Sequence, residues 1–365
     1  MKLICFHLFN DYSGSPKVLR NTLQHLLAKG VEVELVTSRS GVLDEFEGCG
    51  NIKFRSYNYR FSKNATLTML RYIWAQIYTF FIALGYARNK DAVFYINTIL
   101  PAGPALAGWL TGKRVVYHYH ENATVKSGFY RALAWVMQRL ASEIICVSKY
   151  QRSFLKRQKG VNVIPNAIDD AFIARLTPNP QKAFEQKRVL MLGSLKKYKG
   201  TIEFCRLAQA LPQYDFELVI NDTQENIDAF WKENGIERIK NLAVHPRQED
   251  VAPFYNRASM VLNLSNKDLF IETFGLTVLE AMSAGLPVIV PTVGGIAEMV
   301  TDGENGFKIN IQNLSFIAEK IEKVLSNRDL YLSLCERGLA RSKNYSTAVM
   351  AKEILHIISD RANIQ

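Results

Sequence analysis

The strongest constraint on the fold is the alternation of short β-branched and aromatic runs with helical patterns along almost the whole chain. This alternation is typical of parallel α/β architecture, in which a helix crosses back over the sheet after each strand. In the first half it predicts strands at Leu3–Phe9, Val31–Thr37, Ala92–Ile96, Arg114–Tyr119, Glu143–Val147 and Val161–Ile164. The helices expected between them are Pro16–Ala28, Ala65–Ala87 and Tyr130–Ala141.

A polar stretch with two prolines, Thr177–Lys187, interrupts the pattern, and we interpret it as an interdomain linker. The pattern then restarts, with strands predicted at Arg188–Leu192, Phe216–Ile220, Ile239–Val244, Met260–Leu264 and Pro287–Val290. The sequence therefore predicts two Rossmann-like, doubly wound parallel-sheet domains, 1–176 and 177–345, facing a central cleft. A last amphipathic helix, Ser346–Ala362, is expected to pack with the rest of 346–365 back on the first domain.

The composition is that of an ordinary globular protein, because 48% of the 365 residues are apolar and 22% are charged. The five cysteines have no CxxC spacing, and the first residues lack the pattern of a signal peptide. We therefore expect a cytoplasmic protein with reduced, mostly buried thiols.

The charge is unevenly distributed along the chain. Residues 1–175 contain 23 Lys and Arg against 11 Asp and Glu, a formal charge of +12, whereas the remainder carries −1. An anionic surface or acceptor is therefore expected to face the first half. Nucleic acid is disfavoured as a partner, because the sequence lacks zinc-finger spacing, an RNP-like aromatic motif and a basic helix with heptads.

The run Tyr72–Tyr86 is strongly apolar and is bracketed by Arg71 and Arg88. It is shorter than the roughly 20 apolar residues that a membrane-spanning helix needs. Two interpretations stay open: a core helix of the first domain, or a helix that rests on a bilayer surface. The second would make the protein peripheral on the inner face of the cytoplasmic membrane.

The most informative segment is ETFGLTVLEAM, in which the carboxylates of Glu272 and Glu280 lie eight residues apart. Gly275 marks the start of a helix and Gly285 its end, so Glu272 is expected before the helix and Glu280 inside it. A helix N-terminus is a ready site for a diphosphate, and a carboxylate on each side suits sugar hydroxyls. The N–H groups expected to bind the diphosphate are those of Gly275, Leu276 and Thr277. A capped surface helix with two solvated glutamates is the alternative.

A second motif, LGSLKKYKG at residues 192–200, directly follows a predicted strand. Gly193 is expected to let the backbone turn sharply. Lys199 is expected to open the next helix, where the helix dipole disfavours a cation unless an anion such as phosphate lies nearby. A solvated lysine cluster is the alternative. The pair Gly294 and Gly295 after the strand at 287–290 is a weaker signal of the same kind.

Two features of the first half suit an acceptor site. The loop NDYSGSP at residues 10–16 contains Gly14 and Ser15, which are small enough to line a cleft. In the segment YHYHEN, His118 and His120 share one face of a strand, and His120 lies nearer its carboxyl end. A neutral His120 could hydrogen-bond a sugar, although buried structural histidines are the alternative. The pair lacks the further ligands that a metal site needs.

Together these residues resemble the retaining glycosyltransferase family 4, which has the two-domain GT-B fold. Glu272 and Glu280 match its EX7E motif, residues 193–200 are similar to its GRLxxxKG loop, and VIPNAID at 163–169 is similar to its VIPNGID segment. The sequence departs from the family pattern where Ser194 replaces an Arg and Ala167 replaces a Gly. A neighbouring lysine of the loop is expected to compensate for the missing arginine.

The resemblance implies a role for each matched residue. Glu280 would hold the nucleotide ribose, Lys199 would contact the diphosphate, and Glu272 would hold the donor sugar with the backbone of Phe274 and Gly275. The implied donor-binding residues are Gly193, Ser194, Lys199, Glu272, Phe274, Gly275, Leu276, Thr277 and Glu280. The expected acceptor-side residues are Gly14, Ser15, His120 and Asn166. The predicted catalytic residues are His120, Glu272 and Lys199.

The resemblance further implies a retaining hexosyltransferase that uses a UDP- or GDP-sugar and a saccharide or polyprenyl-linked glycan acceptor in polysaccharide or lipopolysaccharide biosynthesis. No cofactor or metal is expected, because the sequence has no Asp-x-Asp motif. Two alternatives stay open: a nucleotide-sugar epimerase of the same architecture, and a non-catalytic nucleotide-sugar-binding protein. A Rossmann dehydrogenase is disfavoured, because no GxGxxG follows the first strand.

Overall fold

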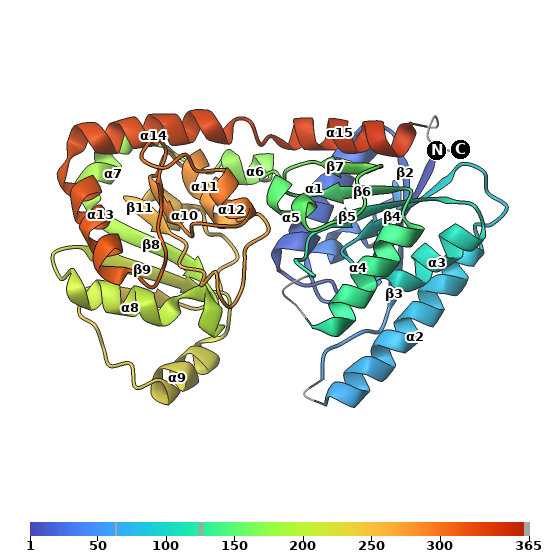
Figure 1. Ribbon diagram of the computed structural model, residues 1–365, viewed down its shortest axis with the longest axis horizontal. Coiled ribbons are helices and arrows are strands. Elements are labelled where there is room, and N and C mark those ends of the chain that lie inside the picture. The colour runs from blue at the N-terminus through green and yellow to red at the C-terminus, as the bar shows by residue number, and fades with distance from the viewer. Residues whose placement is uncertain (63, 124–126, 361–365) are drawn as a thin grey trace. The chain divides into compact units, whose positions relative to one another are not determined.

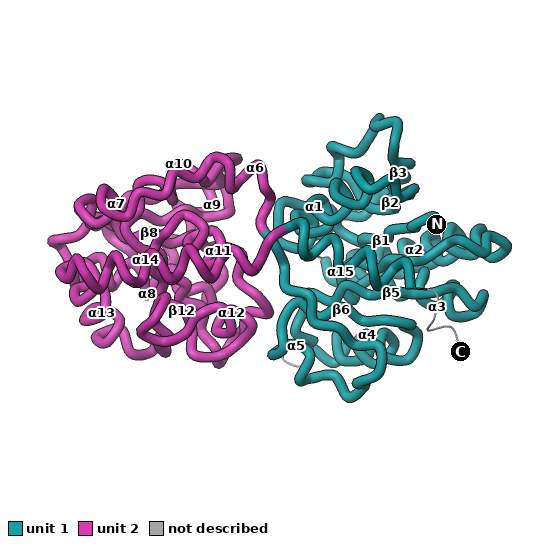
Figure 2. The backbone as a smooth tube through the Cα atoms, turned by 90° about the horizontal axis from the view of Figure 1, so that it is seen from above, with its two compact units in different colours: residues 1–167, 347–365 teal, residues 168–346 magenta. Residues whose placement is uncertain are grey.

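The computed structural model describes residues 1–62, 64–123 and 127–360. The chain forms two compact units, one of Met1–Ala167 together with Thr347–Gln365 and one of Ile168–Ser346 (Figure 2). Each unit is built on a parallel sheet with helices in the connections (Figure 1). The predicted class, two Rossmann-like doubly wound domains, is therefore confirmed.

The first unit contains a seven-stranded sheet in the order β3-β2-β1-β4-β5-β6-β7, in which every neighbouring pair is parallel. Its strands are β1 (Lys2–His7), β2 (Glu32–Ser38), β3 (Ile52–Tyr57), β4 (Ala92–Asn97), β5 (Arg114–Tyr119), β6 (Glu143–Cys146) and β7 (Val161–Val163). The strand order reverses between β1 and β4, where ligands bind in sheets of this type. The last paired residues there are His7 and Asn97.

The helices of the first unit lie in the crossovers between its strands (Figure 1). They are α1 (Gly14–Ala28), the 3-10 helix η1 (Val42–Phe46), α2 (Ala65–Leu84), α3 (Ala102–Leu110), α4 (Gly128–Leu140) and α5 (Lys149–Ser153). The last helix of the chain, α15 (Thr347–Ser359), also belongs to this unit and packs against α1. Residues 361–365, the end of the predicted last helix, lie outside the described residues.

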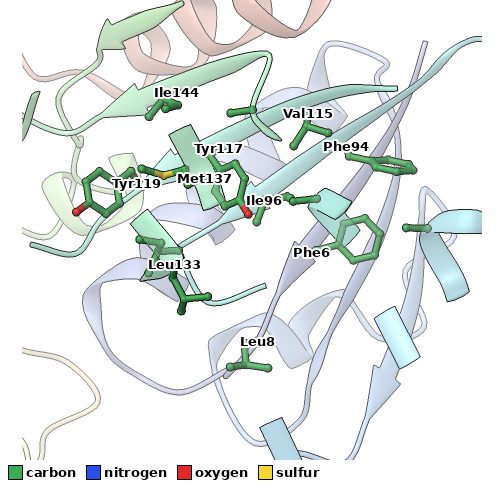
Figure 3. Packing of buried hydrophobic residues seen from close by; sticks show 14 of the residues in the cluster. Phe6, Leu8, Phe94, Ile96, Val115, Tyr117, Tyr119, Leu133, Met137 and Ile144 are labelled. Carbon is green, nitrogen blue, oxygen red and sulfur yellow. The ribbon is translucent and has the colours of Figure 1, made fainter. Parts of the chain in front are cut away.

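One hydrophobic cluster of the first unit is formed where apolar side chains of β1, β4 and β5 meet those of α2, α3 and α4; Figure 3 shows part of it. Phe6 and Phe94 on adjacent strands contact edge to face, with ring centroids 5.7 Å apart. Leu133 and Met137 point from α4 towards Tyr117 in the same cluster. Such packing explains why near-continuous apolar runs become the central strands of a parallel sheet.

The second unit contains a six-stranded parallel sheet in the order β10-β9-β8-β11-β12-β13. Its strands are β8 (Arg188–Gly193), β9 (Asp215–Ile220), β10 (Leu242–His245), β11 (Met260–Leu262), β12 (Val288–Val290) and β13 (Phe307–Lys308). Its helices are α6 (Asp170–Ile173), α7 (Pro180–Gln186), the 3-10 helix η2 (Lys197–Lys199), α8 (Thr201–Ala210), α9 (Gln224–Glu233), α10 (Ala252–Asn256), α11 (Leu276–Ser283), α12 (Gly295–Glu298), α13 (Leu314–Ser326) and α14 (Arg328–Ser342).

The predicted linker at 177–187 is wrong, because most of it forms α7. The side chain of Asn179 caps this helix by accepting a hydrogen bond from the backbone N–H of Lys182 at 3.1 Å, and Ala183 is buried. The division between the units falls after residue 167 rather than 176. The reason is that α6 packs on the second unit, where the rings of Phe172 and Tyr255 lie 5.9 Å apart.

Candidate functional site

The carboxylate pair of the second unit surrounds the start of α11. Glu272 lies in the loop before the helix, and Glu280 is its fifth residue. Gly275 is the N-cap residue, with φ +115°, and a Cβ atom there would lie 2.6 Å from Cγ1 of Ile296. Only glycine fits both restrictions, since the left-handed region is unfavourable for other residues. The backbone of this turn therefore depends on the glycine.

The first N–H groups of α11 are available for a ligand. A helix cannot satisfy its own first N–H groups. Val278 donates its N–H to the Gly275 carbonyl at 3.1 Å. In the described part of the chain, no backbone carbonyl accepts a hydrogen bond from the N–H groups of Gly275, Leu276 or Thr277. The arrangement thus leaves available the three N–H donors that the sequence predicts for a diphosphate site.

Lys199 and Glu272 form an ion pair between Nζ and Oε1. The hydroxyl of Ser265 donates to the same carboxylate oxygen at 2.9 Å. Burial lowers the pKa of Lys199, but the charge and the hydrogen bond of Glu272 outweigh burial, so the pKa is raised above 10.5. Lys199 is therefore a fixed positive charge beside the loop that leads into α11.

The loop at 193–200 differs from the prediction in two details. Gly193 ends β8 without a positive φ, and the left-handed residue is Gly200, at φ +76°. A Cβ atom on Gly200 would lie 2.3 Å from the Leu264 carbonyl oxygen, so this glycine makes the sharp turn possible. Lys199 does not open a helix but ends η2, and the anion that it meets is Glu272.

The rest of the loop is held by contacts with other segments of the second unit. The ring of Tyr198 stacks on Phe270 with centroids 4.5 Å apart, and the Tyr198 carbonyl accepts from the N–H of Asn266 at 2.8 Å. The carbonyl of Ser194 accepts from the Thr201 hydroxyl at 3.0 Å. These contacts fix the backbone from which Lys199 extends.

Glu280 is positioned by a buried tyrosine that sequence reasoning missed. The hydroxyl of Tyr255 lies 2.6 Å from Oε2 of Glu280 and 3.3 Å from the Thr277 carbonyl oxygen. Burial and then the charge of Glu280 raise the pKa of Tyr255 well above its ordinary value, so the phenol remains a donor. Phe274, by contrast, is buried with its ring 5.9 Å from that of Tyr345, which leaves only its backbone for a ligand.

In the first unit, the carboxyl edge of the sheet carries a chain of hydrogen bonds that ends at His120. Nε2 of His7 lies 2.8 Å from the Phe9 carbonyl oxygen, which places the ring proton on Nε2. Nδ1 of His7 then accepts from the Asn97 amide at 3.1 Å. The Asn97 oxygen in turn lies 2.9 Å from Nε2 of His120, so that nitrogen is the donor. Asn97 was not among the predicted residues, yet it fixes the tautomer of His120.

The three histidines of this cluster are neutral. Burial lowers the pKa of His7 to about 4 and that of His118 to about 3. Burial, followed by the proximity of His118 and His7, lowers the pKa of His120 well below 6.5. His118 is fully buried with Nδ1 2.7 Å from the Tyr95 hydroxyl, which matches the structural alternative for that residue.

The other residues that the sequence predicts on the acceptor side occupy two places. Ser15, in the first turn of α1 beside Gly14, accepts a hydrogen bond from the Asn97 amide at its carbonyl, at 3.3 Å. The two residues therefore lie at the same sheet edge as His120. Asn166 follows β7, and its buried side-chain oxygen has no hydrogen-bond partner among the described residues. Such an oxygen is available to a donor that a ligand supplies.

The site residues were only partly accessible to sequence reasoning. Ser265, Tyr255 and Asn97 act through partners that are 7, 25 and 23 residues away in the chain. The structure adds an indication that the sequence does not carry: Thr98, directly after Asn97, has φ +73°, and such strain is common at functional sites. Within residues 1–62, 64–123 and 127–360, no group of three or more His, Cys, Asp or Glu is placed to hold a metal ion.

The sequence matches two family models, one in each half of the chain. Residues 12–172 match "Glycosyltransferase Family 4", and residues 175–341 match "Glycosyl transferases group 1". A D-inositol 3-phosphate glycosyltransferase from Corynebacterium aurimucosum is 28% identical over 228 residues, which cover 56% of this chain and 52% of that protein. The matched stretch thus spans about half the length of that curated relative.

Solved structures with the same fold cover almost the whole chain. The Anabaena protein Alr3699/HepE, solved in complex with UDP and glucose, superposes with a TM-score of 0.79 at 19% identity, covering 99% of this chain and 100% of that one. WaaG, a glycosyltransferase involved in lipopolysaccharide biosynthesis, superposes with a TM-score of 0.72 at 17% identity, covering 98% and 100%. The two family matches together identify the chain as a member of glycosyltransferase family 4, and the likeness to these structures shows the GT-B fold.

Proposed function

We propose that this protein is a retaining hexosyltransferase that transfers a sugar from a UDP- or GDP-sugar to a saccharide or lipid-linked saccharide. The observation that carries the proposal is the Lys199–Glu272 ion pair beside the N–H groups that open α11. Family membership and the fold shared with a UDP-bound neighbour support it. The proposed context is cell-surface polysaccharide or lipopolysaccharide synthesis at the cytoplasmic side of the membrane, to which the WaaG likeness lends support.

The donor is proposed to bind with its diphosphate on the N-terminus of α11. The free N–H groups and the positive end of the helix dipole favour an anion there. Lys199 adds a full charge, and its partner Glu272 holds it in place until the donor arrives. Glu280, oriented by Tyr255, is proposed to accept hydrogen bonds from the ribose hydroxyls. Glu272 is proposed to accept hydrogen bonds from the donor sugar.

The transfer step breaks the bond between the anomeric carbon and the phosphate oxygen and forms a bond to the acceptor oxygen. Negative charge develops on the departing diphosphate, and Lys199 with the α11 N–H groups would stabilise it in the transition state. Because no carboxylate is identified as a covalent nucleophile, we propose front-face attack with retention. The acceptor hydroxyl then gives its proton to the departing phosphate oxygen.

The first unit is proposed to bind the acceptor. His120 is neutral and held in one tautomer, so it can hydrogen-bond a sugar without adding a charge. Ser15 and Gly14 lie at the same sheet edge, and Asn166 offers a buried oxygen without a partner among the described residues. The formal charge of +12 over residues 1–175 suits an acceptor that carries phosphate.

No metal is proposed to take part, since Lys199 and the helix N-terminus supply the positive charge that a metal would otherwise give. Transfer should therefore continue in excess EDTA at an unchanged rate. Loss of activity in EDTA and its recovery with Mg²⁺ or Mn²⁺ would contradict this part of the proposal.

A thermal-shift screen against UDP-, GDP- and ADP-sugars tests the donor site directly. A ligand that binds only the folded state raises the melting temperature, by an amount that grows with its concentration relative to Kd. The expected result is a shift with UDP- or GDP-sugars that Glu280→Gln abolishes. Glu249→Gln, a change at an exposed carboxylate elsewhere in the second unit, is the matched control.

The same donor then separates the proposed activity from the two alternatives. A glycosyltransferase should leave the donor sugar unchanged without acceptor, apart from slow hydrolysis, and should transfer it when an acceptor is added. Net epimerisation of the donor alone would identify an epimerase. Donor binding with neither hydrolysis nor transfer, across saccharide and polyprenyl-linked acceptors, would identify a binding protein.

A further inference from the structure

The outward side of α2 is apolar along its whole length. Leu70, Ile73, Ile77, Phe81 and Leu84 recur at intervals of three and four residues, and all are exposed, Phe81 to 62%. The opposite side consists of small residues that are fully or almost fully buried, namely Ala75, Thr79 and Ala83. A surface helix of a soluble domain normally shows the reverse arrangement, with its polar side outward.

The apolar surface continues on α3 and α4, which lie beside α2 (Figure 1). The helices α2 and α3 approach closely, since a Cβ atom on Gly103 would lie 2.2 Å from the Gln76 carbonyl oxygen. The rings of Tyr72 and Phe129 link α2 to α4 at 5.3 Å. Together the exposed apolar side chains of the three helices form what we call the apolar face: Leu67, Met69, Leu70, Ile73, Trp74, Ile77, Phe81, Leu84, Leu106, Trp109, Leu110, Phe129 and Trp135.

Tryptophan is concentrated in this face. Three of the four tryptophans of the chain, Trp74, Trp109 and Trp135, lie here and are each about half exposed or more. Indole rings favour the boundary between hydrocarbon and water, where one edge is apolar and the N–H remains hydrated. Their placement favours a lipid headgroup region as the occupant.

The charge around the apolar face is positive. Residues 60–140 contain ten Lys and Arg against two Asp and Glu, and neither acidic residue lies in α2, α3 or α4. Arg131 and Arg139 lie one turn to either side of Trp135, and the Arg139 guanidinium lies 5.4 Å from its ring centroid. A surface that combines exposed tryptophan with arginine and no carboxylate complements an anionic bilayer.

The helix α2 is long and apolar enough to cross a membrane, but its inner side is already used by the fold. The Gln76 side chain accepts a hydrogen bond from the N–H of Gly103 at 2.9 Å. The Tyr72 hydroxyl donates to the Leu100 carbonyl at 2.8 Å. Spanning the bilayer would break these contacts and strip α2 from the sheet. The helix can lie in the interface and keep all of them.

We propose that the apolar face docks on an anionic lipid bilayer, with the large side chains of α2 inserted at the level of the headgroups and Arg131 and Arg139 bound to lipid phosphates. An open pocket of about 500 Å³ beside the C-terminal half of α2, lined by Tyr78, Phe81 and Ile82 with Arg55, gives this surface added room for lipid. The inference goes beyond the transfer reaction and does not depend on which sugar is moved.

Vesicle flotation with the full chain tests the proposal. Vesicles of phosphatidylglycerol and phosphatidylethanolamine are compared with vesicles of phosphatidylcholine at increasing NaCl. The protein should float with the anionic vesicles, and the fraction that floats should fall as the NaCl concentration rises. The variant Ile73→Ser/Ile77→Ser/Phe81→Ser should lower the partition coefficient by on the order of 100-fold, because three partly inserted side chains are lost. These side chains are exposed, so circular dichroism and melting temperature should stay unchanged.

The matched control changes three exposed apolar residues outside the apolar face, Ile173→Ser/Phe316→Ser/Val349→Ser. It should float as the unchanged protein does. On anionic vesicles, the tryptophan emission of the control should shift to the blue and be quenched by brominated lipid. The emission of the variant Ile73→Ser/Ile77→Ser/Phe81→Ser, called the face variant, should show neither change. The proposal is overturned if no vesicle binds, if both variants lose binding equally, or if neutral vesicles bind equally well at high salt. It is also overturned if sedimentation without lipid shows a dimer that only the face variant breaks.

Discussion

At the proposed donor site, Lys199 is a cation held by one of the two motif carboxylates. An ion pair of this kind in a free protein orients the lysine and keeps it charged, as the raised pKa of Lys199 indicates. A diphosphate at the proposed site would give Lys199 a second anionic partner, and the lysine would not have to be ordered first. This preorganisation reduces the cost of binding.

Removing the lysine should therefore weaken donor binding. We expect Lys199→Ala to raise the Kd for the UDP- or GDP-sugar by about 10- to 100-fold, the worth of one hydrogen bond to a charged group. Isothermal titration measures the change. Lys182→Ala removes an exposed lysine from α7, elsewhere in the second unit, and is the control. Equal losses from both variants would indicate a diffuse charge effect instead of a contact at Lys199.

Asn97 is proposed as a positioning residue that acts through His120. We expect Asn97→Ala to lower kcat by about tenfold to a hundredfold, since small misplacement of a reacting group has that effect. Donor affinity should not change, because the predicted donor-binding residues belong to the other unit.

A conservative change at the same position separates orientation from folding. Asn97→Asp keeps an oxygen for the Nε2 proton of His120 and adds a negative charge, which should raise the pKa of that histidine. The acidic limb of the pH–rate profile should then move to higher pH. A uniform loss at every pH, with a lowered melting temperature, would point to a purely structural role.

Glu34 predicts a pH dependence of stability. Its carboxylate is fully buried on β2 and lies 3.1 Å from both Lys53 Nζ and Arg55 Nε on β3. Burial raises its pKa, but hydrogen bonds from Tyr86 and Lys53 and the charges of Lys53 and Arg55 outweigh burial, so the pKa is lowered below 4.5. Its ionised form therefore stabilises the folded chain above about pH 4.5, and this contribution disappears as the pH falls through the lowered pKa.

The corresponding variant is Glu34→Gln. We expect it to lower the free energy of unfolding by about 1–3 kcal/mol at pH 7, and by less at pH 3, which lies below the ordinary pKa of 4.5. Urea denaturation at both pH values measures the difference. Glu32→Gln, an exposed carboxylate on the same strand, should have little effect at either pH. A penalty for Glu34→Gln that does not depend on pH would contradict the assigned charge contribution.

At the scale of the element, the turn into α11 depends on Gly275. We expect Gly275→Ala to abolish the donor-induced thermal shift, since the new methyl group would collide with Ile296 in a left-handed backbone. Gly235→Ala is the control, because Gly235 also has a positive φ, +59°, but open space around it. It should cost only about 1 kcal/mol of stability and leave donor binding intact.

The elements that could be predicted from the sequence are those whose signal is local. The run Arg114–Tyr119 became β5 with the predicted bounds, because it is apolar enough to lie in the middle of a sheet. The edge strand β3 is not predicted from the sequence, because the charged residues Lys53 and Arg55 interrupt its apolar pattern. Both form ion pairs with Glu34 on the neighbouring strand β2. The helix α7 was misjudged although Asn179 and Pro180 are ordinary signals for a helix start.

The same distinction holds for the site. Glu272, Gly275 and Glu280 lie within one turn-and-helix segment, so their spacing alone predicted their order around the start of α11. Ser265 contacts Glu272, and Tyr255 contacts Glu280. Asn97 contacts His120. All three of these partners come from other elements. A single sequence carries no information on such pairs until the fold brings the partners together.

At the scale of the whole molecule, the last helix completes the first unit. Met350, Ile354, Ile357 and Ile358 of α15 are buried, and α15 packs against α1. Ending the chain at Ser346 would expose the surface that these side chains cover. We expect a loss of about 5 kcal/mol or more, comparable to the stability of a typical domain.

Limited proteolysis and calorimetry of the shortened chain would measure this loss. The first unit should melt or be digested early while residues 168–346 stay resistant. Removal of only residues 361–365 is the control, and it should leave both units unchanged. Equal stability of the first unit without α15 would show that the helix is dispensable.

Because α15 returns to the first unit, the backbone passes from one unit to the other twice, after Ala167 and after Ser346. The second unit is thus an insertion with two junctions to the first unit, rather than a C-terminal extension. Exchange of the second unit for that of a relative therefore requires a junction at both points. A chimera with a single junction after Ala167 would take its last helix from the relative. Its α1 would then pack against a foreign counterpart of α15.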